Sequence, residues 1–552
     1  MNGPKTQKRR DLVEIFVLIA LFLLLSVFSL THVDKSILVV KYLFQYNIQY
    51  LPQNYFKYHH AFSEFLFQTC IFHQGNSEAG WKTAFFLWPL FVFCDALGGL
   101  TLTNICLFTV ITSLLTLILF YWWVRKNWGP QAAFWGAGFF GFSAVFQEFA
   151  RSGSYDAYSI LTAMLWIMLF FYCAQKATAL SYGVLGFFTG LSWYGYSMLR
   201  TFIVAALIEI FYFAKRRCLS GSLFLAGVFL WIIPGVIILL QVLHRYHFHG
   251  TLGVLMVDKE NIFSIVKGDV HGFFEVIFHN FVNFFKRLLG FNDLMDCPSN
   301  NQAHAHFLNH LLVIPMILGF ISVWKRRKEI SGRLLIMLSA VIFLTPLFTS
   351  SWANNEARRF LFYVLPVYCL IGIGMREIFL WRDSIKREDA RSMAGIWIAL
   401  CVSFVLLSEI QFSNKVILSG QRELGLADFA DKLNERQESA TIVYLEKKQD
   451  SFYYFSNEGY LLRLLLEKNG RHNYEVKETL LDTPLDPSPT FYIVKSPMIT
   501  NKEFRFWCQN NRLVCGHSVL RSAIKNQSVE PLAGDEAFEL YAVSPQGNPS
   551  RI

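Results

Sequence analysis

Apolar runs recur along most of this 552-residue chain and decide what it can fold into. They cover roughly 12–32, 102–124, 132–148, 157–174, 181–198, 201–214, 222–243, 309–323, 334–349, 360–380 and 393–410. A helix that spans a bilayer needs roughly 17–25 predominantly apolar residues. The chain is also 54% hydrophobic and only 16% charged. The sequence therefore predicts a polytopic α-helical membrane protein with about eleven transmembrane helices.

Short basic clusters separate these runs and predict their orientation. They lie at Lys5–Arg10, Arg125–Lys126, Lys176, Lys215–Arg217, Lys325–Lys328 and Arg382–Arg391. Lys and Arg are retained on the cytoplasmic side of a membrane. Placing every cluster inside puts the N-terminus in the cytoplasm and the C-terminus outside. The net charge of +10 resides in these clusters, so no nucleic-acid partner is predicted.

One apolar stretch, 84–97, does not fit this alternation. It contains Pro89 and Asp95 and is followed by Gly98. Counted as a span, it would place the next basic cluster outside. We interpret it as a helix that lies on the outer membrane surface. The first run follows KTQKRR without a small-residue cleavage site, which indicates an anchor rather than a removed signal peptide.

The chain divides at about residue 410 into two predicted regions. Residues 1–410 form the transmembrane domain, with long outer loops at 33–101 and 244–308, and 411–552 form an extracytoplasmic domain. This second region is polar and has strand-like runs (ATIVYLEKK, TFYIVKS, AFELYAVS) and helix-like runs (ADFADKLNER, GYLLRLLLEK). Its length suits a small α/β domain. Cys508 and Cys515 are close enough in this region to form a disulfide.

Acids, arginines and tyrosines follow several of the predicted spans on the outer side. They are Asp34, Arg151, Asp156, Tyr194, Tyr196, Arg200, Arg358 and Arg359. Ionisable groups at membrane level are costly and indicate a functional site. A single arginine is explained equally well by anchoring to lipid phosphates, and tyrosines by an interfacial belt. The set as a whole favours an enzyme that acts on an anionic lipid headgroup.

The first outer loop adds three potential metal ligands. His59, His60 and Glu64 lie in YFKYHHAFSEF, and the last two share one face if the segment is helical. A divalent metal bound by His and carboxylate is one interpretation. No fixed ligand spacing supports it, so no cofactor is assigned.

The order of these motifs resembles the GT-C superfamily of polytopic glycosyltransferases, in the protein O-mannosyltransferase and aminoarabinose-transferase branch. Asp34 matches the acid after the first span. Arg151 and Asp156 match an R-x-x-x-x-D loop, and the YGYSMLR segment (194–200) matches Tyr-x-Tyr-x-x-x-Arg. The AlaArgArg of 357–359, followed by Pro366, matches a late outer loop. The chain departs at Lys35 and at 59–61, where the branch commonly has Asp-Glu and His-Pro-Pro.

This resemblance implies transfer of a sugar from a polyprenyl-phosphate donor to a protein, lipid or glycan acceptor. Arginine forks bind phosphate oxygens, so Arg200, Arg358 and Arg359 are expected to bind the donor phosphate. Asp34 is expected to be the base and Asp156 its support, with inversion at the anomeric carbon. The implied location is a bacterial inner membrane. The rivals are a transporter or flippase of lipid-linked glycans and a structural protein with a sensory outer domain.

Overall fold

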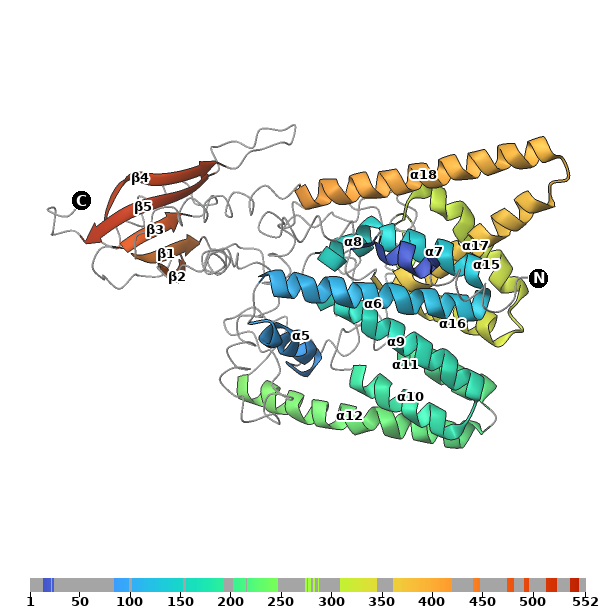
Figure 1. Cartoon of the computed structure of the whole chain (residues 1–552). Helices are drawn as coiled ribbons and strands as arrows, with labels where there is room; N and C mark the ends of the chain where they lie inside the picture. Colours follow the sequence, from blue (N-terminus) through green and yellow to red (C-terminus); the bar gives the residue numbers. More distant parts are fainter. Residues whose placement is uncertain are drawn as a thin grey trace.

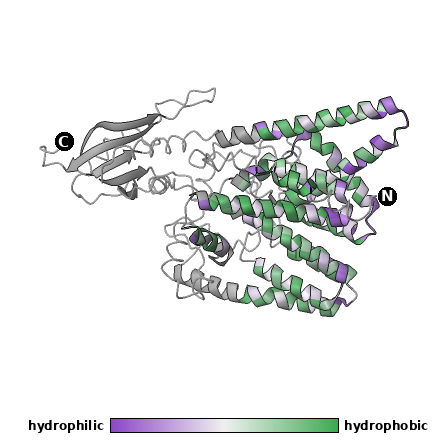
Figure 2. Ribbon diagram, viewed as in Figure 1, coloured by the Kyte–Doolittle hydropathy of each residue, from purple (hydrophilic) through white to green (hydrophobic). Residues whose placement is uncertain are grey.

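The structure is a bundle of helices followed in the chain by a five-stranded sheet (Figure 1). This computed structural model describes residues 13–20, 22–23, 84–98, 102–151, 155–192, 202–214, 216–246, 274–275, 277–278, 281–282, 286, 308–344, 361–418, 440–446, 474–480, 491–495, 513–523 and 537–545. Figure 2 shows that the bundle helices are apolar along most of their length. Their polar residues gather mainly at the helix ends.

Apart from Ser143 and residues at the ends of runs, the described parts of the predicted apolar runs are helical. The helices are α5 (Ala84–Ala96), α6 (Leu102–Trp128), α7 (Pro130–Phe142), α8 (Ala144–Arg151), α9 (Tyr155–Lys176), α10 (Ala179–Ser192), α11 (Phe202–Phe213), α12 (Arg217–Tyr246), η3 (His310–Leu312), α15 (Val313–Lys325), α16 (Ile330–Leu344), α17 (Leu361–Ser384) and α18 (Glu388–Leu418). By length and composition, four stretches of the described helices can cross a membrane: Asn104–Trp128, Ala157–Lys176, Val364–Ser384 and Glu388–Gln411.

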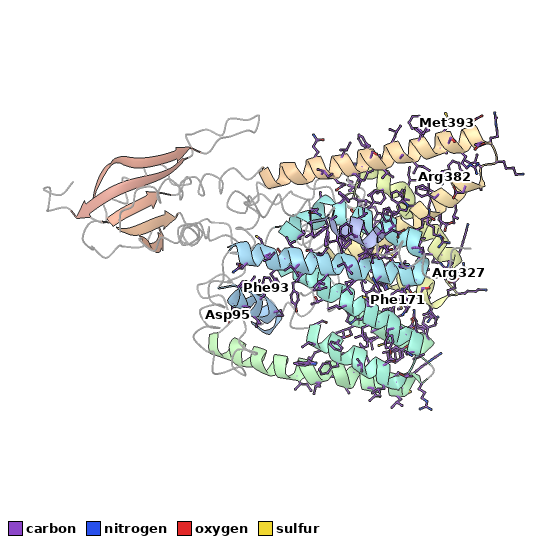
Figure 3. All side chains as sticks on the ribbon, in the orientation of Figure 1. Phe93, Asp95, Phe171, Arg327, Arg382 and Met393 are labelled. Atoms are coloured by element: carbon purple, nitrogen blue, oxygen red, sulfur yellow. The ribbon has the colours of Figure 1, made fainter. Side chains whose placement is uncertain are left out.

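Tight hairpins close one end of the bundle, which we call the basic end. Gly129, with φ 97°, joins α6 to α7, and Ala177, with φ 51°, follows α9. Residues 214–216, 326–329 and 385–387 join the next helix pairs. Basic residues occur at each of these connections, and Figure 3 shows Arg327 and Arg382 there. The structure thus brings the described basic clusters to one end.

An ion pair tightens the hairpin between α15 and α16. The guanidinium Nε of Arg326 donates to both carboxylate oxygens of Glu329 at 3.0 Å. These hydrogen bonds lower the pKa of Glu329. The pair is exposed, so its main effect is to fix the turn rather than to stabilise the bundle.

Glycines let the helix backbones touch. Gly136 of α7 faces Gly372 of α17, and Gly186 of α10 faces Phe224 of α12. A Cβ on Gly372 would lie 2.8 Å from the Cα of Gly136. Small residues at such crossings allow the close packing that associates helices in lipid.

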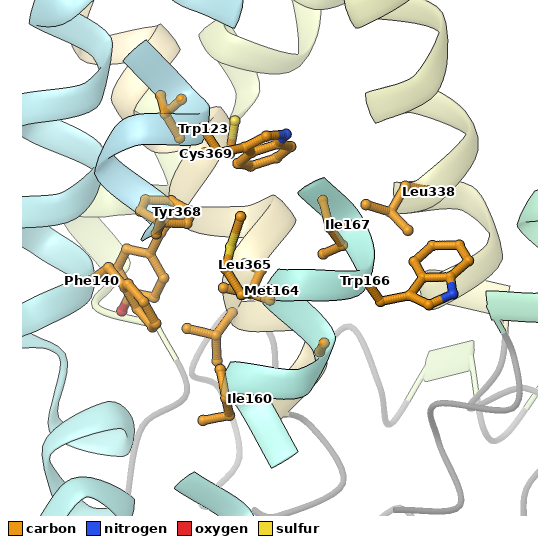
Figure 4. Packing of buried hydrophobic residues seen from close by; sticks show 14 of the residues in the cluster. Trp123, Phe140, Ile160, Met164, Trp166, Ile167, Leu338, Leu365, Tyr368 and Cys369 are labelled. Carbon is orange, nitrogen blue, oxygen red and sulfur yellow. The ribbon is translucent and has the colours of Figure 1, made fainter. Parts of the chain in front are cut away.

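Large side chains fill the spaces that the glycine contacts leave. Tyr368 of α17 lies beside Phe140 of α7, with ring centroids 5.8 Å apart (Figure 4). Phe140 also packs against Phe146 of α8, with ring centroids 4.0 Å apart. These rings are almost fully buried. The core therefore centres on α17 and the helices around it.

The predicted third span is two helices rather than one. Helix α7 ends at Phe142, and Ser143 has φ −60° and ψ 134°, which is extended backbone. Helix α8 then begins at Ala144. In addition, α18 continues to Leu418, past the predicted boundary at 410. The stretch 84–97, which was predicted to be an interfacial helix, forms helix α5. This helix contains Pro89.

The sheet comprises β1 (Ala440–Glu446), β2 (Tyr474–Leu480), β3 (Phe491–Lys495), β4 (Leu513–Ala523) and β5 (Ala537–Pro545), in the order β2-β1-β3-β5-β4. Strand β1 pairs parallel with β2 and β3, whereas β5 pairs antiparallel with β3 and β4. A parallel pair needs a crossover connection of about a dozen residues. The helix-like run GYLLRLLLEK lies in the connection between β1 and β2, outside the described residues. The domain boundaries stay a prediction.

Candidate functional site

The end of the bundle opposite the basic end, which we call the site end, is formed by helix termini. Helices α8, α10 and α16 end there, and α9, α11 and α17 begin there (Figure 1). Figure 3 places Asp95 of α5 toward this end, away from Arg327 and Arg382. These termini flank residues 152–154, 193–201 and 345–360. Three of the predicted site segments are therefore bounded by helix termini at one end.

Two predicted site residues belong to described helices. Arg151 is the last residue of α8, and Asp156 is the second residue of α9. The structure does not describe their side chains. The remaining predicted site residues lie outside the described part of the chain: Asp34, His59, His60, Glu64, Tyr194, Tyr196, Arg200, Arg358 and Arg359.

Helices α9 and α17 pack together in their N-terminal halves. Figure 4 shows Leu365 of α17 close to Met164 of α9, with Ile160 further along α9 in the same buried cluster. Both helices belong to the same buried cluster and both run from the site end to the basic end. Asp156 precedes Ile160 by four residues, about one helical turn. Helix α17 begins at Leu361, two residues after Arg359 in the sequence, while both arginines lie outside the described residues.

Trp166 of α9 contacts both α10 and α11, the helices that precede and follow the 193–201 segment. Its indole N–H donates to Thr189 Oγ1 of α10 at 2.8 Å. Its ring stacks on Phe202 of α11, with centroids 4.5 Å apart and planes at 24°. Phe202 comes two residues after Arg200 in the sequence. The predicted Tyr-x-Tyr-x-x-x-Arg element is thus flanked by helices that are anchored on α9.

Helix α8 is fixed at the end that carries Arg151. The hydroxyl of Thr109, on α6, donates to the carbonyl oxygen of Ala150 at 2.9 Å. Phe149 and Ala150 are 0% exposed. A helix leaves its last carbonyls without partners, so the bond from Thr109 satisfies one of them. The backbone that leads into Arg151 is consequently held in the core.

The helix at 13–20 and 22–23 lies against the same element. Phe22 and Phe146 of α8 have ring centroids 5.9 Å apart. Leu18 and Phe22 are buried. The first predicted span therefore packs on the helix that ends at Arg151, and Asp34 follows that span in the sequence.

A buried polar cluster at the break between α7 and α8 was missed by the sequence analysis. Ser143 accepts from the N–H of Phe146 at 3.3 Å, and Glu409 of α18 accepts from the N–H of Ala144 at 2.7 Å. The hydroxyl of Tyr368 and the side chain of Ser143 also form a hydrogen bond. The available signal was the acid inside the apolar run VLLSEIQF.

A second buried acid is paired within the bundle, between the C-terminal half of α11 and the first turn of α16. Glu209 of α11 accepts from Arg333 of α16 at 2.9 Å, and it is 1% exposed. The guanidinium also lies 3.8 Å from the ring centroid of Phe213. Because the charges neutralise each other away from the site end, we assign this pair to packing rather than chemistry.

No metal centre is built by the described residues: no group of three or more His, Cys, Asp and Glu occurs among them. The cysteines of the described helices are free thiols: Cys94, Cys106, Cys173, Cys218, Cys369 and Cys401. The predicted ligands His59, His60 and Glu64 and the cysteine at 508 lie in segments that the structure does not describe. A divalent metal therefore stays a prediction of the sequence.

Comparisons with known proteins find likeness in structure rather than in sequence. No family model matches the chain, and no curated protein matches it. The crystal structure of ArnT from Cupriavidus metallidurans bound to undecaprenyl phosphate is similar, with a TM-score of 0.48, 11% identity, 96% of this chain covered and 97% of that chain.

The oligosaccharyltransferase of Archaeoglobus fulgidus is also similar. Its apo form has a TM-score of 0.49 and 10% identity, over 92% of this chain and 69% of that chain. The complex of AglB from the same organism with an inhibitory peptide and a dolichol-phosphate has a TM-score of 0.45 and 12% identity, over 83% and 64%. ArnT and AglB are GT-C superfamily glycosyltransferases, the superfamily that the sequence motifs resemble.

Proposed function

We propose that this protein is a membrane glycosyltransferase that moves a sugar from a polyprenyl-phosphate donor to an extracytoplasmic acceptor. The observation that carries the proposal is the packing of α9 against α17, where Met164 and Leu365 belong to one buried cluster (Figure 4). It supports an arrangement in which an acid and paired arginines converge at the membrane surface. The proposed orientation has the basic end in the cytoplasm and the site end outside, because Lys and Arg mark the cytoplasmic side.

The chemistry explains why arginines and acids are needed together. A polyprenyl-phosphate sugar carries an anionic leaving group, and arginine forks stabilise phosphate oxygens through paired hydrogen bonds. We assign this role to Arg358 and Arg359, assisted by Arg200. The acceptor hydroxyl loses a proton as it attacks the anomeric carbon, and a carboxylate is a suitable base. We assign Asp34 as that base.

The other predicted residues support these two roles. Asp156 orients the acceptor or closes its loop, because pairing with Arg151 would make it a weaker base. Tyr194 and Tyr196 contact the substrate. A direct displacement by the acceptor inverts the anomeric configuration. The polar C-terminal region, on the same side as the site end, serves acceptor binding or stability.

The second candidate is a flippase of lipid-linked glycans, and the break between α7 and α8 is the observation in its favour. Discontinuous helices and intramembrane acids are common in transporters. Here the polar groups at Ser143, Ala144 and Glu409 are bonded to one another and to neighbouring helices. That bonding favours a fixed break over a moving gate.

The test uses purified protein in lipid with radiolabelled polyprenyl-phosphate sugars and extracted envelope fractions. Changing Arg358 and Arg359 together to Ala removes the proposed phosphate contacts. Each charge-assisted hydrogen bond contributes roughly 1.5–3 kcal/mol, so donor affinity should fall by at least about tenfold. Lys at either position should restore little, because it lacks the fork. Asp34→Asn should abolish turnover but retain donor binding.

The matched control is Arg382→Ala. Arg382 is an interfacial arginine at the basic end, where it pairs with Asp383. Its loss should leave donor affinity unchanged. If the double variant of Arg358 and Arg359 binds donor like the wild type, those arginines only anchor the helix to lipid. Movement of labelled donor across the bilayer without transfer would select the flippase.

A further inference from the structure

Glu409 is a buried acid in α18 that the proposed chemistry does not use. It is 8% exposed and lies in the apolar stretch Glu388–Gln411, which is otherwise poorly covered by protein. An acid in such a stretch is costly, so it indicates a role other than lipid contact. The residues that bond to it identify that role.

Glu409 and Ser408 join α18 to two other elements of the bundle. Glu409 Oε2 accepts from the backbone N–H of Ala144, the first residue of α8, at 2.7 Å. The neighbouring residue on α18, Ser408, bonds to Asn309, the residue before η3. In this bond Asn309 donates to Ser408 Oγ at 2.8 Å. One carboxylate thus connects segments that are separated by 265 positions along the chain.

The position on α8 suits a negative charge. The first N–H groups of a helix have no partner within the helix and carry partial positive charge. Ser143 accepts from one of them, the N–H of Phe146, and Glu409 accepts from another. Arg151 follows Ala144 by seven residues, which is about 10 Å along a helix axis. Glu409 therefore fixes one end of a short, rigid element whose other end is Arg151.

We propose that Glu409 is a positioning residue: by fixing the start of α8 it places Arg151 at the site end for transfer. This inference rests on the proposed function, because it assigns Arg151 to the working site. Glu409 acts through Arg151 and does not touch the substrate. Since α18 runs on to Leu418 and leads toward the C-terminal region, the contact also links that region to the site.

Kinetic coupling between Glu409 and Arg151 separates positioning from simple stabilisation. Misplacing a substrate-contacting group by about 1 Å can lower turnover about 100-fold. Glu409→Ala should therefore lower kcat/KM about 10- to 100-fold in an otherwise wild-type protein. In an Arg151→Lys background the same change should cost no more than about twofold, because residues that act as a unit are not additive. Equal losses in both backgrounds would overturn the proposal.

Two further variants guard against misfolding. Glu409→Gln keeps a carbonyl oxygen that can accept from Ala144, so it should retain most of the activity. Ala144→Pro removes the N–H donor at a helix position where proline is tolerated, and the extended Ser143 suits a residue before proline. It should reproduce the loss seen with Glu409→Ala. Normal activity of a folded Ala144→Pro protein would contradict the inference.

The matched control is Glu377→Gln. Glu377 of α17 is also an acid in a predicted span, and it accepts an interhelical hydrogen bond from Ser322 at 3.0 Å. Ser322 and Glu377 lie in the C-terminal parts of α15 and α17, the two helices whose ends lead into the basic end. If Glu377→Gln lowers activity, it should do so by the same factor in the wild-type and the Arg151→Lys backgrounds. Unequal effects would show that the coupling is not particular to Glu409.

A readout that is independent of transfer distinguishes failure of this inference from failure of the proposed function. Arg151→Cys is treated with a membrane-impermeant maleimide, and modification of that peptide is followed by mass spectrometry. Glu409→Ala should change its rate by at least about threefold, the scale of a shift in local opening of under 1 kcal/mol. If the wild type transfers no sugar, the glycosyltransferase proposal fails, and this labelling alone decides the positioning. An unchanged rate would refute it.

Discussion

The contact between Gly136 of α7 and Gly372 of α17 predicts that a single added methyl group will separate two helices. A Cβ on Gly372 would lie 2.8 Å from both Cα and N of Gly136, and closer still to the carbonyl oxygen of Ala132. All of these atoms belong to backbone, so no side chain can swing away. Ordinary contact begins at 3.4 Å, so the distance to the Ala132 oxygen, 2.2 Å, must grow by 1.2 Å and the distances to Gly136 by 0.6 Å.

Gly138→Ala is the matched control for Gly372→Ala. Its nearest neighbour would be Leu18 Cδ2 at 3.9 Å, which is ordinary contact. Both changes replace a helical glycine by alanine and share a gain of about 1 kcal/mol in helix propensity. Overpacking typically costs about 1–3 kcal/mol. The difference in stability between the two variants should equal that overpacking cost, with Gly372→Ala the less stable.

Unfolding by heat and by added SDS, followed through tryptophan fluorescence in lipid nanodiscs, measures this difference. Because α17 begins two residues after Arg359, its displacement should also weaken donor binding in Gly372→Ala but not in Gly138→Ala. Equal stability of the two variants would refute the close approach of α7 and α17. If Gly372→Ala loses stability but keeps its donor affinity, the helix contact is supported and its proposed effect on the site is refuted.

The remaining predictions concern the paired charges and the orientation. Replacing Glu209 or Arg333 alone by Leu should destabilise the protein by about 3–5 kcal/mol, whereas the double replacement should recover most of it. If the stability lost in the double variant equals the sum of the losses in the two single variants, measured by SDS unfolding, the pairing is contradicted. Exposed Cys218 should react with impermeant maleimide in inside-out vesicles and not in right-side-out ones. Buried Cys94, whose pKa burial raises to about 12, should react in neither, because the thiolate is the nucleophile.

The helices and the shared position of the basic clusters were predictable because both follow from local composition. Apolar runs form helices in a membrane since no other open structure satisfies their backbone groups. Strands β1, β3 and β5 were predicted from the strand-like runs ATIVYLEKK, TFYIVKS and AFELYAVS. Strand β2, with the sequence YEVKETL, was missed because its charged residues hide the pattern. Strand β4 was missed as well, and it carries irregular register near Ser518.

The break at Ser143 could not be predicted from the neighbouring residues. The run FGFSAVF looks continuous, and serine alone does not end a helix. The break is stabilised by Glu409 and Tyr368, which are more than 200 residues away in the chain. Sequence reasoning named Arg151 as a site residue but could not find what holds it, because that information lies in tertiary contacts.

The hairpins at the basic end have a consequence for how such a protein can diversify. A connection such as Gly129, with φ 97°, permits almost no insertion, because the two helices it joins are already in contact. At the other end, each helix pair returns the chain to the same surface. Segments there can lengthen or change composition without altering which helices pack. New acceptor preferences can thus arise by exchange of surface segments while the transmembrane scaffold is inherited intact.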